Sequence, residues 1–183
     1  MKNRRFAIVA FLLIAVLVMG VGYAAVTRSL SVTGKAAFGT NVANFPVKIE
    51  NPTVTDATKI TDDTQLQTAV HFTVGTDGIT LTANVQSGML VSANDGAEDY
   101  VTFTFDITNY SEHYKADIKD PVVTDGDYLD VTVTGVDATT VLDIKDGAND
   151  TATVTVVVKL VDLPNEDKTL EFTIKIDAVS VEG

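Results

Sequence analysis

The feature that most constrains the fold is a strict alternation of apolar and polar residues that recurs along the chain. The segment YVTFTFDITN (100–109) has Val101, Phe103, Phe105 and Ile107 at every second position, with threonine or aspartate between them. Successive side chains of a β-strand point to opposite faces, so this segment has one apolar face for a core and one polar face for water. The alternation therefore predicts a half-buried strand.

The same pattern predicts further strands at 26–33, 45–51, 128–135 and 151–162. The segments 66–75 and 78–87 meet at the turn sequence TDG and predict a β-hairpin. In the segment 169–183 the alternation slips at Ala178 and Val179, which predicts a bulge or a change of strand partner. The residues expected to face the core are Val70, Phe72, Val74, Ile79, Leu81, Ala83, Val85, Leu129, Val131, Val133, Ala152, Val154, Val156, Val158, Leu160, Leu170, Phe172, Ile174 and Ile176.

Roughly eight or nine such strands, with turn residues between them and no amphipathic helix in the body, predict an all-β fold. The chain has 183 residues, of which 45% are hydrophobic and 21% charged, and this suffices for one folded domain. We expect an antiparallel two-sheet sandwich, with either jelly-roll or immunoglobulin-like connectivity, preceded by an N-terminal hydrophobic helix or signal segment.

The N-terminus has the parts of a secretory leader. Three basic residues lie within the first five positions and precede the uninterrupted apolar run 6–19. The sequence GVGYAA (20–25) follows, and its small residues fit cleavage by a signal peptidase between Ala24 and Ala25. This reading predicts a secreted, extracellular protein.

The alternative is that the segment stays as a membrane-spanning helix. The uncharged stretch runs from Phe6 to Thr27, which is long enough to cross roughly 30 Å of hydrocarbon as a helix. The protein would then contact the membrane only through residues 6–26. The expected parts are a signal peptide or membrane helix (1–24), an N-terminal strand of the donor type (25–36) and a β-sandwich domain (37–183).

Charge and cysteine content exclude several classes of function. The formal net charge is −12, and removal of the three basic leader residues leaves 10 basic against 25 acidic residues, or −15. A body this acidic repels nucleic acid phosphates and anionic membrane surfaces. The chain has no cysteine, which excludes disulfides, thiolate metal sites and cysteine nucleophiles.

Several segments together resemble a known family. The leader ending in GVGYAA is followed by SLSVTGKAAFG (29–39) and NFPVKIEN (44–51), and later by YVTFTFDITNYSEHYKADI (100–118) and TATVTVVVKL (151–160). This layout resembles the TasA/camelysin-like surface proteins of Firmicutes, which are processed by a SipW-like signal peptidase. The resemblance implies a secreted jelly-roll subunit of extracellular or biofilm-matrix fibres, in which an N-terminal strand completes the sheet of the neighbouring subunit. The camelysin name carries a protease activity, but this chain has no HExxH zinc motif, so we do not expect that activity.

Strand donation also fits the residues themselves. A sheet that lacks a strand exposes unpaired N–H and C=O groups, which an extended segment of another chain can pair. The alternation over 26–33 puts Val26, Leu30 and Val32 on one face, and we expect these side chains to fill pockets of a neighbour. Gly34 and the residues after it would form a flexible exit. The alternative is that this strand pairs within its own sheet.

Two acidic loops, SANDGAED (92–99) and DIKDGAND (143–150), are candidates for calcium binding because calcium takes several oxygen ligands. Neither loop has EF-hand spacing. Asn, Asp and Gly are also ordinary turn residues that tolerate positive φ, so a purely structural turn is the alternative. The candidate ligands in the second loop are Asp143, Asp146, Asn149 and Asp150.

No pattern in the sequence predicts catalysis, and we expect neither an enzyme nor a required cofactor. His71 lies on an expected strand and His113 in a loop, which makes a poor catalytic or metal-binding pair. A nucleophile elbow, a phosphate-binding glycine loop and a paired-carboxylate signature are all absent from the sequence. The glycosylation patterns NYS (109–111) and NDT (149–151) are interpreted as chance matches.

These observations together predict a secreted structural subunit of a cell-surface or biofilm-matrix fibre. We expect it to polymerise with itself through its N-terminal strand. The alternatives are a membrane-anchored, pilin-like surface domain and a calcium-dependent adhesive domain.

Overall fold

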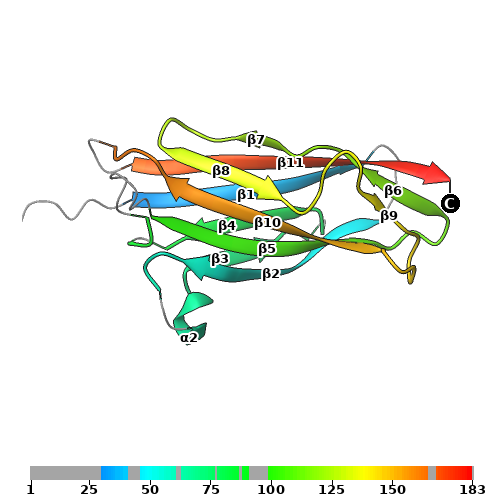
Figure 1. Cartoon of the computed structure of the whole chain (residues 1–183), viewed down its shortest axis with the longest axis horizontal. Helices are drawn as coiled ribbons and strands as arrows, with labels where there is room; N and C mark the ends of the chain where they lie inside the picture. The colour runs from blue at the N-terminus through cyan, green and yellow to red at the C-terminus, as the bar shows by residue number, and fades with distance from the viewer. Residues whose placement is uncertain are drawn as a thin grey trace, which may run out of the picture.

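The computed structural model describes residues 30–40, 46–60, 63–76, 78–86, 88–90, 99–164 and 168–182. Within these residues the chain forms two β-sheets that face each other across one core, as the sequence predicts (Figure 1). The expected leader, its cleavage position at Ala24 and Ala25, and Val26 lie outside the described residues. Of the helices that are described, none has the length and apolar character needed to cross a bilayer.

In the described part of the chain, the larger sheet consists of β1 (Leu30–Thr40), β3 (Val70–Val74), β4 (Thr80–Val85), β6 (Tyr114–Ile118), β7 (Val122–Thr124), β9 (Val141–Leu142) and β11 (Lys168–Glu182). Its order is β3-β4-β1-β11-β6-β9, and β7 pairs with β11 beside this path. β1 runs parallel to β11, whereas the other neighbours are antiparallel. The expected hairpin of β3 and β4 is confirmed.

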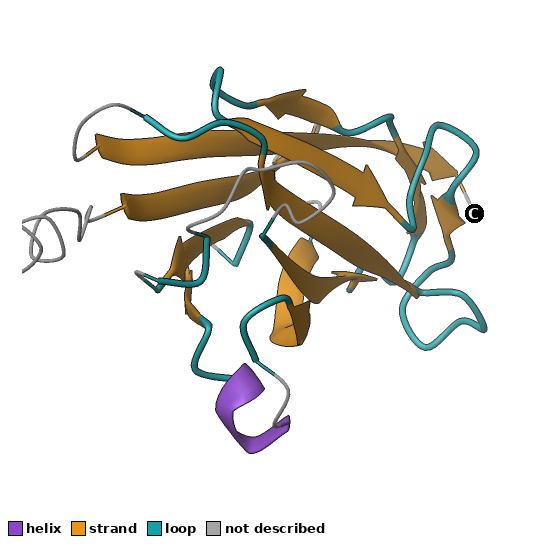
Figure 2. Ribbon diagram, turned by 60° about the vertical axis from the view of Figure 1, so that its left-hand side comes forward, coloured by secondary structure: helices purple, strands orange, loops and turns teal. Residues whose placement is uncertain are grey.

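The smaller sheet consists of β2 (Val47–Ala57), β5 (Tyr100–Asn109), β8 (Leu129–Thr134) and β10 (Thr151–Leu160), in the order β2-β5-β10-β8. β2 lies at its edge and is irregular. The register with β5 shifts between Glu50 and Thr53, where Asn51 has a φ of 50° and Pro52 follows. Bulges and proline on an edge strand hinder pairing with another chain. A single helical turn, α2 (Asp63–Leu66), lies outside the two layers (Figure 2).

The core between the sheets consists largely of the predicted inward-facing residues. Val101, Phe103, Phe105 and Ile107 of β5 are each at most 1% exposed. The ring of Phe103 lies 5.4 Å from that of Phe72, centroid to centroid, and so joins the two sheets. Val74 is 38% exposed, contrary to the prediction, because it ends the short edge strand β3. Phe72, Ile79, Val133 and Ala152 are only partly buried, and the other predicted core residues are buried.

The predicted irregularity at the end of β11 is a change of partner. Residues at even positions stay buried from Leu170 through Ala178. On the flank opposite β1, β11 pairs with β7 over residues 173–175 and with β6 from Ala178 onward. β11 therefore continues without a bulge while its neighbour changes.

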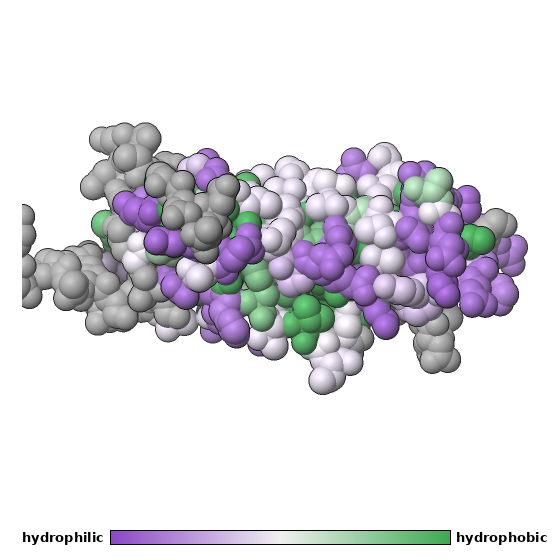
Figure 3. Space-filling model, turned by 90° about the horizontal axis from the view of Figure 1, so that it is seen from below, coloured by the Kyte–Doolittle hydropathy of each residue, from purple (hydrophilic) through white to green (hydrophobic). Residues whose placement is uncertain are grey.

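Seen from below, the molecule shows mostly hydrophilic and neutral surface, and the hydrophobic areas on this face are small and separated (Figure 3).

Candidate assembly site around strand β1

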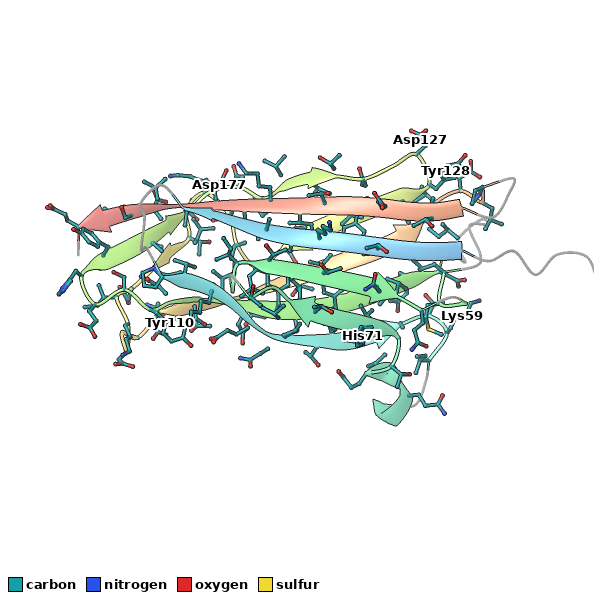
Figure 4. The ribbon with its side chains drawn as sticks, turned by 180° about the vertical axis from the view of Figure 1, so that it is seen from behind. Lys59, His71, Tyr110, Asp127, Tyr128 and Asp177 are labelled. Atoms are coloured by element: carbon teal, nitrogen blue, oxygen red, sulfur yellow. The ribbon has the colours of Figure 1, made fainter. Side chains whose placement is uncertain are left out.

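β1 is the first described strand of the chain, yet it lies in the middle of the larger sheet. It pairs with β4 on one flank, with Val32 opposite Val85 and Ala37 opposite Thr80. On the other flank it pairs with β11 along its whole length, from Leu30 opposite Lys168 onward. Figure 4 shows β1 and β11 side by side along the molecule.

This arrangement differs from a sheet that waits for a strand from outside. In the single chain the position is filled by the protein's own N-terminal strand, which is the alternative that the sequence left open. The strand also extends further than predicted, because it passes through Gly34 and continues to Thr40. Of the three proposed pocket-filling residues, Val32 is buried at 2% exposure, Val26 lies outside the described residues, and only the backbone of Leu30 is described.

The inward face of β1 carries small side chains. Val32, Gly34 and Ala36 are all buried, and they alternate with Thr33 and Lys35 on the outer face. On β11 the residues in register with these three are large: Leu170, Phe172 and Ile174. The core therefore accommodates a strand with small inward-facing residues at this position.

The closest fit occurs at Gly34. This residue lies between Phe172 on β11 and Ala83 on β4 in the register of the sheet. A Cβ atom on Gly34 would overlap the tip of the Phe172 ring, which is itself 3% exposed. Glycine is thus required for close approach of the ring to the backbone, which explains why it does not end the strand.

One hydrogen bond on the outer face ties β1 to β4. The Thr33 hydroxyl donates to Oδ1 of Asn84 over 3.0 Å, and these residues are directly opposite each other. The cross-strand bond adds to the ladder without involving the core.

The candidate calcium loop forms turns closed by its own hydrogen bonds. The Asp146 N–H donates to Oδ2 of Asp150 over 2.9 Å, and Asp146 has a φ of 63°. Asp143 is held by Lys115, whose Nζ lies 3.2 Å from Oδ1, and by the Asn149 N–H at 3.3 Å from Oδ2. The interaction with Lys115 holds the pKa of Asp143 below its usual value.

The one described residue of the first acidic loop, Asp99, forms an ion pair within the fold. Asp99 is 1% exposed and its Oδ1 lies 3.0 Å from Nζ of Lys59, while residues 91–98 are outside the described ranges. Among the residues that the structure describes, no group of three or more His, Cys, Asp or Glu side chains is placed to hold a metal ion. The geometry of the 143–150 loop therefore favours the structural alternative.

The buried side chain of Asn109, which the sequence analysis named only in a glycosylation pattern, connects β5 to the loops around it. Asn109 has no exposed surface, and its Nδ2 donates to the carbonyls of Tyr114 (2.9 Å) and Asp143 (2.8 Å). Its Oδ1 accepts from the Ser111 N–H over 3.0 Å. Both polar atoms of the side chain therefore take part in hydrogen bonds of the fold.

The two histidines are not brought together. His71 is exposed on the edge strand β3, and His113 is exposed in the loop that follows Tyr110. Figure 4 shows His71 and Tyr110 at separate places along the sandwich.

Comparison with known proteins adds no relative: no protein-family model matches the chain, and no curated protein matches it.

Proposed function

We propose that this protein is a secreted structural subunit that assembles into an extracellular fibre by exchanging β1 between neighbouring copies. The observation that carries the proposal is the position of β1, an N-terminal strand in the middle of a sheet. The resemblance of the sequence to TasA/camelysin-like surface proteins supports the same function.

Removal of β1 would divide the larger sheet. Its neighbours β4 and β11 have no pairing with each other, so the strand alone connects the β3–β4 hairpin to the group of β11, β6, β7 and β9. The resulting gap would expose backbone donors and acceptors on both sides. Such a gap needs a strand, and β1 from another copy would fill it with the same contacts.

The parallel pairing of β1 and β11 suits exchange. Parallel neighbours cannot be joined by a tight hairpin, and here they are the first and last strands of the described chain. Residues 41–46 alone separate β1 from β2, which belongs to the other sheet. During exchange, β1 moves as a unit while the rest of the sandwich keeps its order.

In this proposal each copy donates β1 to the next and accepts β1 from the previous one. Such head-to-tail contacts do not close on themselves when the rotation between copies is not a simple fraction of a turn, so they give a filament. The fit of Gly34 against Phe172 provides the specificity, because a larger residue at this register overlaps the Phe172 ring and weakens insertion.

The proposal also includes the connectivity of the sandwich, which we take to be that of a jelly roll. The chain changes sheet at every strand connection except β3–β4 and β6–β7. This repeated crossing supports jelly-roll over immunoglobulin-like connectivity, in which more consecutive strands stay in one sheet.

Secretion is the other half of the proposal, and it depends on the N-terminal sequence. Sequencing of the native protein's first residues tests it. A start at Ala25 supports cleavage and release, whereas an intact Phe6 contradicts release and supports a membrane-anchored subunit.

Strand exchange is tested by disulfide trapping, which is clean here because the chain has no cysteine. Thr33 and Asn84 face each other across β1 and β4, and opposite residues of an antiparallel pair are about 4.5–5.5 Å apart at Cα, within the range of a disulfide. The double variant Thr33→Cys, Asn84→Cys is allowed to assemble and is then oxidised. We expect a ladder of covalent multimers on a non-reducing gel.

The matched control is Thr73→Cys, Thr82→Cys, which joins β3 to β4 within one chain in every assembly state. This variant should give monomers only. Oxidation of the Thr33/Asn84 pair before assembly should lock β1 in its own chain and abolish fibres in electron micrographs. If the Thr33/Asn84 pair gives monomers under all conditions, strand exchange is wrong.

A further inference from the structure

The β3–β4 hairpin is a neighbour of β1 in the larger sheet, and three contacts of its own also fix it to the smaller sheet. We propose that these contacts hold the hairpin in place when β1 leaves, so that the gap between β4 and β11 keeps the width of one strand. This role rests on the proposed exchange of β1, whose acceptor site the contacts position. We call them the hairpin clamp; they join Gln67 to Thr53 and Val54, Phe72 to Phe103, and Gly78 to Ile49.

One contact of the clamp lies at the open end of the hairpin. Gln67 comes shortly before β3, and its Nε2 donates to the carbonyl of Val54 on β2 over 2.8 Å. Its Oε1 accepts from the Thr53 hydroxyl over 3.0 Å. A single amide side chain therefore connects the start of β3 to the edge strand of the smaller sheet, and neither hydrogen bond involves β1.

A second contact lies at the turn between β3 and β4. The carbonyl of Gly78 accepts a hydrogen bond from the Ile49 N–H of β2 over 2.8 Å. Between the two ends, the ring of Phe72 lies 5.4 Å from that of Phe103 on β5, centroid to centroid. The hairpin is thus held against the smaller sheet at both ends and in its middle.

The clamp decides the position of one side of the gap. Without β1, β3 and β4 are left as a two-stranded ladder, and such a ladder alone is marginally stable in water. On the other side, β11 keeps β6 and β7 as neighbours. If the clamp holds the hairpin, the gap stays about 9.6 Å wide, which is twice the spacing of paired strands. An incoming β1 then pairs without first ordering the hairpin, and this lowers the entropic cost of binding.

Amide hydrogen exchange of the native protein, measured residue by residue by NMR, tests the clamp without any need for assembly. Two amides report on the two events. The hydrogen bond from Gln86 to Ala69 shows that even-numbered residues of β4 bond to β3, so the N–H of Ala83 points to β1. The Ile49 N–H bonds instead to Gly78 of the hairpin.

We expect the protection factor of Ile49 to exceed that of Ala83 by about tenfold or more, because β1 opens while the hairpin stays in place. A protection factor of Ile49 equal to or below that of Ala83 would show that the hairpin leaves together with β1 or before it. Either result would overturn the clamp.

The variant Gln67→Leu tests the contact at the open end. Loss of its hydrogen bonds should lower the protection factor of Ile49 by about fivefold relative to that of Ala83, which corresponds to one net hydrogen bond. A general loss of stability would instead lower both factors together. The control is Gln65→Leu, at an exposed residue of α2, and it should leave the ratio unchanged. An unchanged ratio in Gln67→Leu would contradict the role of Gln67.

Covalent multimers of the Thr33→Cys, Asn84→Cys chain remain the separate test of exchange. Multimers together with equal protection of Ile49 and Ala83 would overturn the clamp and leave strand exchange intact. Greater protection of Ile49 without multimers under any condition would support the clamp and contradict the exchange.

Discussion

The ring of Phe172 on β11 lies directly against the backbone of Gly34 on β1, where even a single methyl group would overlap it. These residues are in register on neighbouring parallel strands, and both are buried. The Phe172 side chain of β11 thus limits which residue β1 can carry at position 34. This contact makes the glycine a recognition element for β1, whether the strand comes from the same chain or from another.

Substitution of Gly34 by valine should weaken the insertion of β1. The added side chain forces the Phe172 ring out of a close-packed core, and such overpacking costs about 1–3 kcal/mol. Chemical denaturation should show this loss, and trapped multimers of the Thr33/Asn84 cysteine pair should decrease. Gly34→Ala should act in the same direction with a smaller effect.

A double-mutant cycle distinguishes this contact from a general effect of removing glycine. Shortening the ring by Phe172→Leu should relieve the overlap, so Gly34→Ala should cost less in that background, with a coupling free energy on the order of 1 kcal/mol. Additive effects of the two substitutions would show that the residues do not oppose each other in the core.

A charge on the inward face of β1 should be far more damaging than one on the outer face. Val32 is 2% exposed, and Val32→Asp would bury a carboxylate without a partner at a cost of roughly 3–5 kcal/mol. Lys35→Asp introduces the same carboxylate on the exposed face of the same strand and should change the free energy of unfolding little. Similar melting temperatures for the two variants would mean that β1 does not belong to the core.

Asn109 should be the most sensitive polar residue in the region of the 143–150 loop. Asn109→Leu removes the buried donor to the carbonyls of Tyr114 and Asp143 and the acceptor of the Ser111 N–H, and we expect a loss of about 1–3 kcal/mol. Thr108→Val, at the neighbouring outward position, is the control and should be nearly neutral. Thermal unfolding of the three proteins gives the comparison.

Local alternation was enough to predict the longer strands of both sheets, but β6, β7 and β9, which have only two to five residues each, were not predicted. β5 has the predicted limits because large apolar residues alternate with polar residues along its whole length. The extent of β1 could not be predicted in this way. Its inward residues after Val32 are Gly34 and Ala36, which have no alternation signal of their own, and their burial depends on large residues from β11.

Apart from the β3–β4 hairpin, the partner of each strand could not be predicted from the sequence. A parallel contact between the first and last described strands depends on the closure of the whole sandwich and on no local signal. The same holds for Asn109, which resembles an ordinary strand-end residue in the sequence and whose hydrogen bonds reach the backbone of Ser111, Tyr114 and Asp143. Its position at an inward phase of the β5 alternation was the one available indication.

The loop 143–150 should not respond to calcium. Its carboxylates already bind Lys115, backbone N–H groups and the Thr151 hydroxyl, so a cation would have to break these contacts to enter. We expect equal melting temperatures in millimolar calcium and in EDTA. A clear increase with calcium that Asp150→Asn removes would revive the adhesive-domain alternative.

Acid should weaken the fold partly through Asp143. Its pKa is lowered in the folded protein, first by the hydrogen-bonded Lys115 ammonium, so the carboxylate stabilises the fold above its unfolded-state pKa. That contribution is lost as the pH falls below about 4 and through the lowered folded-state pKa. The melting temperature of Asp143→Asn should therefore be lower than that of the parent at neutral pH, and the difference should shrink on acidification. Asp127→Asn, at an exposed carboxylate near the other end of the sandwich, is the control. A difference for Asp143→Asn that stays constant from pH 7 to about pH 2 would show that the ion pair with Lys115 does not contribute to stability.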